Sequence, residues 1–258
     1  IDNFQISNFK LSKSMIDALA IIKRSAAIAN HQLGLIDKNI KDAIISSADE
    51  IIVGKFDNQF LIDIFQTGSG TSSNMNCNEI ISNRASEILG GTIGTKKPVH
   101  PNDHVNLGQS SNDVIPTAIH IAANTLIENQ LIPSLQLLET ELEKKSLEFK
   151  DIIKIGRTHL QDATPITLGQ EFSGYLYMIK NSITRIINTQ KLMSELAIGG
   201  TAVGTGINTH AKFASIVALE VSKYTNMNFI EAPNHFEAQG AQDAAIETSG
   251  ALKSIAVS

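Results

Sequence analysis

The chain has 258 residues, 42% of them hydrophobic, which is enough to bury the core of one large domain or two ordinary ones. Its 21 basic against 26 acidic residues give a net charge of −5, so it offers no basic field to a nucleic-acid backbone. A single cysteine, Cys77, excludes an intrachain disulfide, and no apolar run reaches the ~20 residues that span a bilayer. We therefore expect a cytoplasmic protein that binds neither nucleic acid nor membrane.

In the first part of the chain, the spacing of apolar residues predicts three helices. They cover about residues 12–31, 38–53 and 73–89, and glycines follow each of them. Residues 92–108 contain several turn formers and are expected to be irregular, with room for short hairpins. We place a domain boundary near Gly108, which divides the chain into an N-terminal domain, 1–108, and a second domain, 109–258.

After residue 108 the predicted helices become much longer. One covers about 112–149 with a kink at Pro133, another covers 167–196, and shorter helices follow at about 212–224 and from 234 onward. Helices of roughly 30 residues exceed the average of ~11–12 and indicate a bundle of long rods. We predict a mainly all-α fold, in which an N-terminal helical domain is joined to part of a long-helix bundle. Because these helices are too few to close a bundle, partner chains or further sequence should cover their apolar faces.

Two polar loops precede predicted helices. Thr67-Gly-Ser-Gly-Thr-Ser-Ser-Asn74 is not a phosphate loop, because no Gly-Lys-Ser/Thr and no third glycine follow. An N-cap formed by Ser72, Ser73 or Asn74 would explain it, but hydroxyls and free N–H groups at a positive helix end also suit a carboxylate. The second loop, Gly108-Gln-Ser-Ser-Asn-Asp113, has more polar side chains than a cap requires. By contrast, the glycines of 199–206 indicate a close backbone crossing.

Histidines occur in two further polar segments. His159 lies in Gly156-Arg-Thr-His-Leu-Gln-Asp-Ala163, just before a helix expected to start near Pro165. A lone histidine is usually structural, but the polar neighbours favour a proton-transfer role. In His100-Pro-Asn-Asp-His104, Pro101 breaks the helix that would align two metal ligands, so a polar turn is favoured over a metal site. The remaining histidines are expected to be structural or solvated.

Five segments, in the same order, resemble the class II fumarases of the fumarase/aspartase superfamily. They are residues 66–76, 100–106, 110–113, 156–163 and 199–208, and Ser69 and 232–237 resemble that family as well. His159 discriminates within the superfamily, because aspartases resemble this segment but carry glutamine at that position. Each segment is weakly specific alone, but all five in register are highly specific.

The resemblance implies reversible hydration of fumarate to (S)-malate in the tricarboxylic acid cycle. It implies no metal and no organic cofactor, and a homotetramer whose active sites are shared between subunits. His159 would transfer the proton, and the substrate carboxylates would be held by Ser69, Gly70, Thr71, Ser110, Ser111, Asn112 and Thr158. A second, peripheral dicarboxylate site is implied at His100, Pro101, Asn102 and Asp103, with Lys97 as a basic neighbour.

Two further expectations concern the ends of the chain and the alternative functions. The chain starts at Ile1 and stops at Ser258 inside a helical pattern, while the family's mobile Gly-Ser-Ser loop would come later. We therefore expect a piece of a longer fumarase that is inactive by itself. An aspartase-like ammonia lyase and a non-catalytic helical scaffold of the same superfamily are the alternatives.

Overall fold

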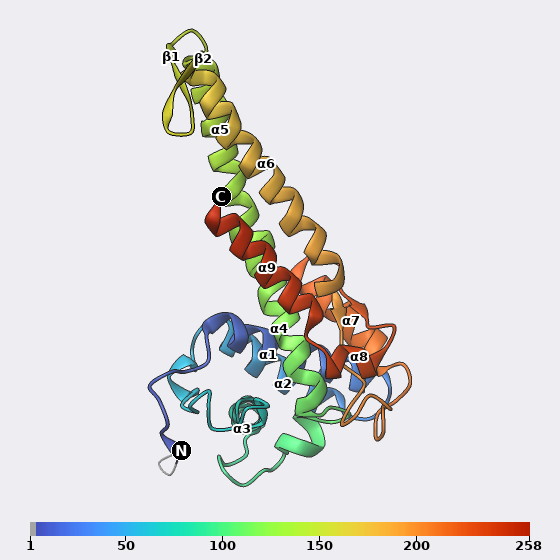
Figure 1. Ribbon diagram of the computed structural model, residues 1–258. Helices are drawn as coiled ribbons and strands as arrows, with labels where there is room; N and C mark the ends of the chain where they lie inside the picture. Colours follow the sequence, from blue (N-terminus) through green and yellow to red (C-terminus); the bar gives the residue numbers. More distant parts are fainter. Residues whose placement is uncertain (1–3) are drawn as a thin grey trace. The chain divides into compact units, whose positions relative to one another are not determined.

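The computed structural model describes residues 4–258, so the first three residues of the predicted 1–108 domain lie outside it (Figure 1). The mainly α-helical fold is confirmed, with nine α-helices and four short strands in this range. Contacts within the chain define two compact units. Unit 1 comprises residues up to Ala123 together with Met193–Gln242, and unit 2 comprises Asn124–Leu192 and Asp243–Ser258. The domain division at residue 108 stays a prediction.

Unit 1 is built around helix α1 (Lys13–Gln32), which is buried on most of its surface. It begins at Ser12, whose hydroxyl accepts a hydrogen bond from the Met15 amide at 3.4 Å. Helices α2, α3 and α7 pack against it. The other elements of the unit are α2 (Lys38–Ile52), η2 (Asp57–Gln59), α3 (Thr71–Ile88), η3 (Pro101–Val105), most of α4 (Ser111–Leu126), β3 (Glu195–Leu196), α7 (Phe213–Thr225), β4 (Ile230–Glu231) and α8 (His235–Gly240).

The core of unit 1 follows the predicted apolar stripes. Leu19 and Ile22 of α1 are fully buried, and Ile44 of α2, Ile81 of α3 and Phe213 of α7 are fully buried in the same cluster. Strands β3 and β4 pair in parallel and join the segment after α6 to the segment after α7. The three helices predicted in the first part of the chain are thereby confirmed.

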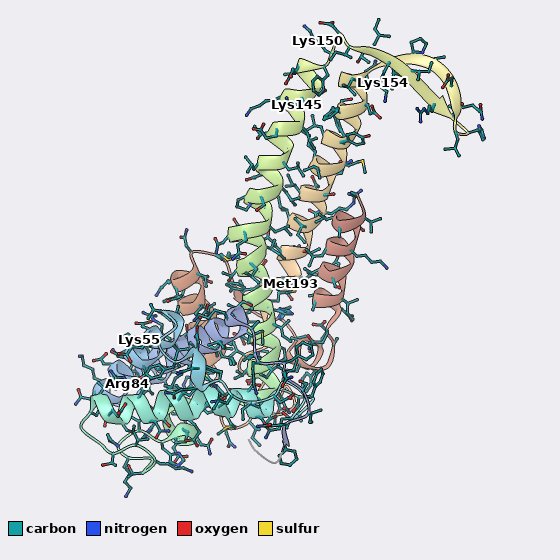
Figure 2. The ribbon with its side chains drawn as sticks, turned by 90° about the vertical axis from the view of Figure 1, so that its left-hand side faces the viewer. Lys55, Arg84, Lys145, Lys150, Lys154 and Met193 are labelled. Atoms are coloured by element: carbon teal, nitrogen blue, oxygen red, sulfur yellow. The ribbon has the colours of Figure 1, made fainter. Side chains whose placement is uncertain are left out.

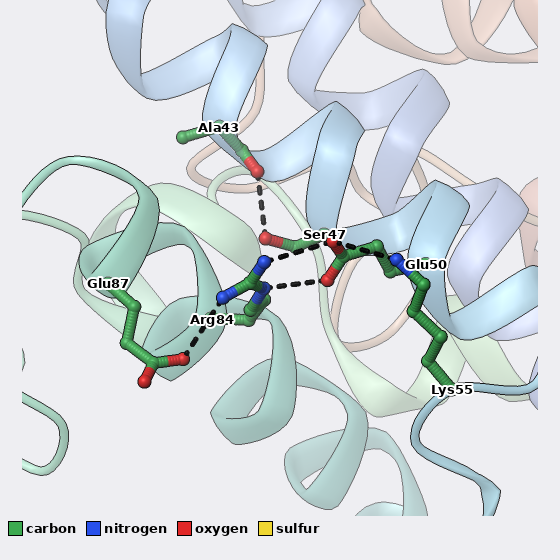
Figure 3. A network of polar contacts seen from close by, with 6 residues as sticks. All are labelled: Ala43, Ser47, Glu50, Lys55, Arg84 and Glu87. Carbon is green, nitrogen blue, oxygen red and sulfur yellow. Dashed lines mark hydrogen bonds and ion pairs between the residues drawn. The ribbon is translucent and has the colours of Figure 1, made fainter.

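At the surface of unit 1, a charged network joins α2 to α3 (Figure 3). The Arg84 guanidinium donates to both carboxylate oxygens of Glu50, at 2.6 and 3.0 Å. Lys55 adds a contact of 3.2 Å to Glu50, and Arg84 also reaches Glu87 at 3.5 Å. These cations, Arg84 above all, hold the pKa of Glu50 below its usual value.

Unit 2 consists of long helices with a small core. Beyond the end of α4 it contains η4 (Ile127–Leu131), α5 (Ile132–Glu148), β1 (Ile153–Thr158), β2 (Gln161–Thr167), α6 (Leu168–Met193) and α9 (Asp243–Val257). The two long helices are confirmed, and the interruption expected at Pro133 is a π-helical turn immediately before α5. The core cluster of the unit is Ile127, Ile132 and Ile186. Many large apolar side chains remain exposed on α5, α6 and α9, among them Leu137, Leu138, Tyr177, Met178, Ile187 and Ile246.

A β-hairpin in unit 2 was not predicted. Strands β1 and β2 pair in antiparallel fashion between α5 and α6 (Figure 1). Lys154, labelled in Figure 2, lies on β1, and its ammonium donates to the Glu171 carboxylate of α6 at 2.5 Å. The helix start expected near Pro165 is wrong, because Pro165 lies in β2 and α6 begins at Leu168. No Asn-Gly or Asp-Gly pair marks the turn, which is why the sequence did not reveal it.

Residues 92–108 contain one π-helical turn, η3, and no strand, so the expected irregular segment is confirmed. One smaller expectation needs correction. The helix predicted from 234 onward is two helices, since α8 ends at Gly240 and α9 begins at Asp243. Among the helices of residues 4–258, none combines the length and hydrophobicity that crossing a membrane requires.

Candidate active site

A cavity of about 540 Å³ in unit 1 brings together residues from two of the polar loops. Ser69 comes from the loop before α3, and Ser111 and Asn112 come from the start of α4. Gly70, Thr71 and Ser110 adjoin these residues in sequence but do not line the cavity. Its other walls include Ile115, Pro116, Ile119, Ala202, Val203, Phe236, Gln239 and Gln242. Ala202, Val203 and Phe236 belong to the segments 199–208 and 232–237 singled out in the sequence, whereas the other five residues were not selected.

The first loop owes its shape to Gly70. This residue is the N-cap of α3 and has a φ of 72°, a left-handed conformation that glycine adopts readily. A Cβ at this position would lie 2.9 Å from the Ile115 side chain. The alternative of an N-cap by Ser72, Ser73 or Asn74 is not found, because the cap is a glycine and Thr67 Oγ1 accepts from the Ser72 amide at 3.3 Å. Ser69 and Thr71 share a hydrogen bond between their hydroxyls at 2.9 Å.

The second loop is fixed by the buried carboxylate of Asp113. Its Oδ1 accepts from the Ser110 amide at 2.9 Å, and its Oδ2 accepts from the amides of Gly199 and Thr201 at 3.0 and 2.9 Å. Burial raises the pKa of Asp113 to about 6, although these three N–H groups oppose the shift. Asp113 thereby joins the start of α4 to the glycine loop, where Gly199 lies so close to Ala214 that the expected backbone crossing is confirmed.

Asn112 and Ser111 occupy the first turn of α4. The Asn112 side-chain amide donates to the carbonyl of Ala202 at 2.6 Å, and its backbone amide donates to Ser110 Oγ at 3.3 Å. Behind the cavity, the buried Asn74 amide donates to Ser111 Oγ at 2.9 Å. Sequence reasoning had weighed Asn74 only as a cap, and it had not selected the lysine behind it, Lys23. A lysine between apolar positions of a buried helix was the available signal.

Thr158 and His159 lie on the hairpin in unit 2, whereas the residues that line the cavity belong to unit 1. His159 and Leu160 form the turn, with φ of 47° and 59°. Two successive positive φ values are typical of the tight turn that matches the twist of a hairpin. Both side chains are exposed, and that of Leu160 is 94% exposed. The hairpin thus presents an imidazole at its tip.

The segment of the predicted second site forms η3. His100 is its N-cap, and the Nδ1 atom of its ring accepts from the amides of Asn102 and Asp103 at 3.2 and 3.1 Å. This leaves Nε2 as the donor of the neutral imidazole. Within residues 4–258, no group of three or more His, Cys, Asp and Glu side chains is arranged to hold a metal ion.

The fold and these loops are those of a lyase family: the chain matches the lyase family model over residues 3–258 and belongs to that family. Within it, the resemblance to class II fumarases is confirmed. The chain is 54% identical over 256 residues to the class II fumarate hydratase of Nitrosomonas europaea, covering 99% of the chain and 55% of that relative. It is also 54% identical over 258 residues to the mitochondrial fumarate hydratase of Saccharomyces cerevisiae, covering 99% of the chain and 53% of that relative.

A solved structure agrees with the sequence comparisons. The class II fumarase of Schistosoma mansoni matches with a TM-score of 0.97 at 39% identity, covering 99% of this chain and 57% of that one. The chain therefore spans about half the length of the curated relatives it matches.

Proposed function

We propose that the complete protein catalyses the reversible hydration of fumarate to (S)-malate, and that this chain supplies part of each active site. The observation that carries the proposal is the cavity shared by Ser69, Ser111 and Asn112, in a chain 54% identical to a class II fumarate hydratase. Hydroxyl and amide donors beside helix N-termini suit a carboxylate. A dicarboxylate substrate such as fumarate has two carboxylates that these donors could bind.

In this proposal, His159 transfers the proton of the water that is added or removed. Imidazole can hold or release a proton near neutrality. Removing a proton next to a carboxylate leaves charge that spreads onto that carboxylate, so fixed donors that tighten on it lower the barrier. Thr71, Ser110 and Thr158 complete the proposed donor set together with the three side chains that line the cavity.

A homotetramer in which sites are shared between subunits belongs to the same proposal. Its support is the exposed apolar surface of α5, α6 and α9, which a partner helix would cover. The cytoplasmic location also belongs here, and it stays a prediction because one similar relative is named mitochondrial.

We propose the second dicarboxylate site at the start of η3. The Nε2 atom of His100 would donate to a carboxylate, with Pro101 and Asn102 shaping the turn around it. Asp103 belongs to the same turn, and its carboxylate lies 3.3 Å from His100 Nδ1.

The test is a substitution of His159 in the complete protein. We expect His159→Asn to lower kcat by about 10²- to 10⁴-fold, which is the usual contribution of general acid–base catalysis. Loss of fumarate absorbance in the far ultraviolet measures turnover. His210→Asn is the matched control, because the His210 side chain is exposed and its Nδ1 atom accepts a hydrogen bond from the neighbouring Lys212 amide, so the activity of this variant should equal that of the wild type. Unchanged turnover in His159→Asn would remove His159 from the mechanism, and turnover of L-aspartate but not malate would favour the ammonia lyase.

A further inference from the structure

Lys23 is a fully buried lysine in the middle of α1. Its ammonium donates to two neutral side-chain oxygens, Asn106 Oδ1 and Gln109 Oε1, each at 2.8 Å. The titratable groups that face it are Cys77 of α3 and Asp113 of α4. Burying an ammonium costs several kcal/mol unless its interactions compensate, so packing alone is a poor reason for a lysine here.

From Lys23, hydrogen bonds lead to the wall of the cavity. Asn106 Oδ1 also accepts from Asn74 Nδ2, at 3.4 Å, and the same Asn74 amide donates to Ser111 Oγ at 2.9 Å. All four side chains belong to unit 1, and Asn74 is completely buried. Lys23 is therefore connected to a residue that lines the cavity through two asparagines.

The Lys23 ammonium determines which groups donate and which accept along this series of hydrogen bonds. It has only donors, so Asn106 must turn its oxygen toward Lys23, and its Nδ2 donates to the Gln109 carbonyl at 3.3 Å. Asn74 must then offer its NH₂ group to that oxygen. The same NH₂ group donates to Ser111 Oγ, so this oxygen acts as an acceptor on the side that faces Asn74. The hydroxyl proton of Ser111 must therefore point away from Asn74.

We propose that Lys23 is a positioning residue, which through Asn106 and Asn74 compels Ser111 to present its hydroxyl proton to a carboxylate bound in the cavity. The inference rests on the proposed function and deepens it, because it assigns the donor direction at one substrate contact. Without the ammonium, Asn106 and Asn74 can rotate their amides, and Ser111 can turn its proton inward. A hydroxyl that offers only lone pairs would repel the carboxylate.

The test measures binding of succinate, a dicarboxylate without a double bond or hydroxyl, to the complete protein by titration calorimetry. We expect Lys23→Met to raise the Kd of succinate about tenfold, as losing a hydrogen bond to a charged group does. In the Ser111→Ala background, the same substitution should change the Kd by less than about twofold, because the terminal donor is already absent. Ser25→Ala is the control, since the buried Ser25 hydroxyl on the same helix has no hydrogen-bond partner among the described residues, and it should leave the Kd unchanged.

A second measurement needs no substitution at Lys23, in case Lys23→Met does not fold. Burial lowers the pKa of Lys23 to about 8, so its charge falls within an accessible pH range. The pKa of Asp113 lies near 6 and that of Cys77 near 12, on either side of this range. Succinate should therefore bind the wild type several-fold more weakly at pH 9 than at pH 7, and Ser111→Ala should lack this dependence.

The outcomes separate the two proposals. Equal effects of Lys23→Met with and without Ser111, or equal pH dependence in wild type and Ser111→Ala, would overturn the role of Lys23. Succinate binding with the expected coupling but no turnover of fumarate or malate would refute the hydratase and leave the role of Lys23 supported. A wild type that does not bind succinate would refute both.

Discussion

The two units of this chain treat apolar and charged side chains in opposite ways. Unit 1 surrounds α1 with other helices and buries even a lysine and an aspartate beside its apolar core. Unit 2 has a core cluster of three isoleucines and leaves Leu137 and Tyr177 of its long helices 65% and 63% exposed. A helix whose apolar surface stays uncovered obtains little stability from its own chain. Unit 1 should therefore be stable by itself, whereas unit 2 should depend on further helices.

The largest expected effect compares a leucine from each unit. Leu19→Ala in α1 should lower the free energy of unfolding by about 4 kcal/mol, because it removes a fully buried side chain and leaves a cavity. Leu138→Ala in α5 should cost less than about 0.5 kcal/mol in this chain, since that side chain is 44% exposed. Urea unfolding followed by circular dichroism measures both. Equal losses would show that unit 2 is as well packed as unit 1.

The next effect concerns the buried charge of Lys23. Because its folded pKa is about 8 and its ordinary value is 10.5, the unfolded chain binds more protons between these pH values. The Lys23 contribution to the free energy of unfolding therefore rises with pH across this window, by up to about 3 kcal/mol.

The matched comparison is Lys23→Met, which lacks that titration. Its stability relative to the wild type should fall by about 3 kcal/mol as the pH is raised from 8 to 10.5. Cys77 titrates above its usual range, which lowers stability with increasing pH, but it is present in both proteins and largely cancels in the difference. A constant difference over this range would show that the pKa of Lys23 is not lowered in the folded chain.

A smaller loss is expected at the carboxylate that joins α4 to the glycine loop. Asp113→Ala removes the acceptor of three backbone N–H groups, but it also removes the cost of burying a charge. The net loss in the free energy of unfolding should be about 2 kcal/mol. Hydrogen exchange read by mass spectrometry should show faster exchange at Gly199 and Thr201 and unchanged exchange in α5. Uniformly faster exchange in both units would mean that the loss is not confined to unit 1.

The smallest effect is expected at the charged network of Figure 3. Glu50→Gln should reduce the free energy of unfolding by about 0.5 kcal/mol, because partly exposed ion pairs are screened by water and salt. The loss should vanish in 1 M salt, where the Debye length is about 3 Å. Thermal unfolding at low and high salt provides the comparison. A loss that persists in high salt would indicate packing rather than charge.

Much of the fold followed from periodicity, and less of the site did. The stripes of α1, α2 and α6 are visible in the sequence because each helix has one predominantly apolar face. The hairpin was missed because His159 and Leu160 adopt positive φ without the Asn or Gly that usually marks such a turn. Ser69, Ser111 and Asn112 could be selected as polar residues at helix starts. Lys23 stands between apolar positions of its helix in the sequence, but its link to the site depends on contacts with residues more than 80 positions away.

At the tip of the hairpin, backbone preference and proposed chemistry conflict. A positive φ raises the conformational free energy of residues other than glycine and asparagine, so Asn-Gly in place of His159 and Leu160 would form a turn of lower free energy. The same exchange would delete the imidazole. Consensus turn design for higher thermostability would thus favour the replacement that removes the proposed proton-transfer group, a trade-off between stability and the proposed activity confined to two neighbouring residues.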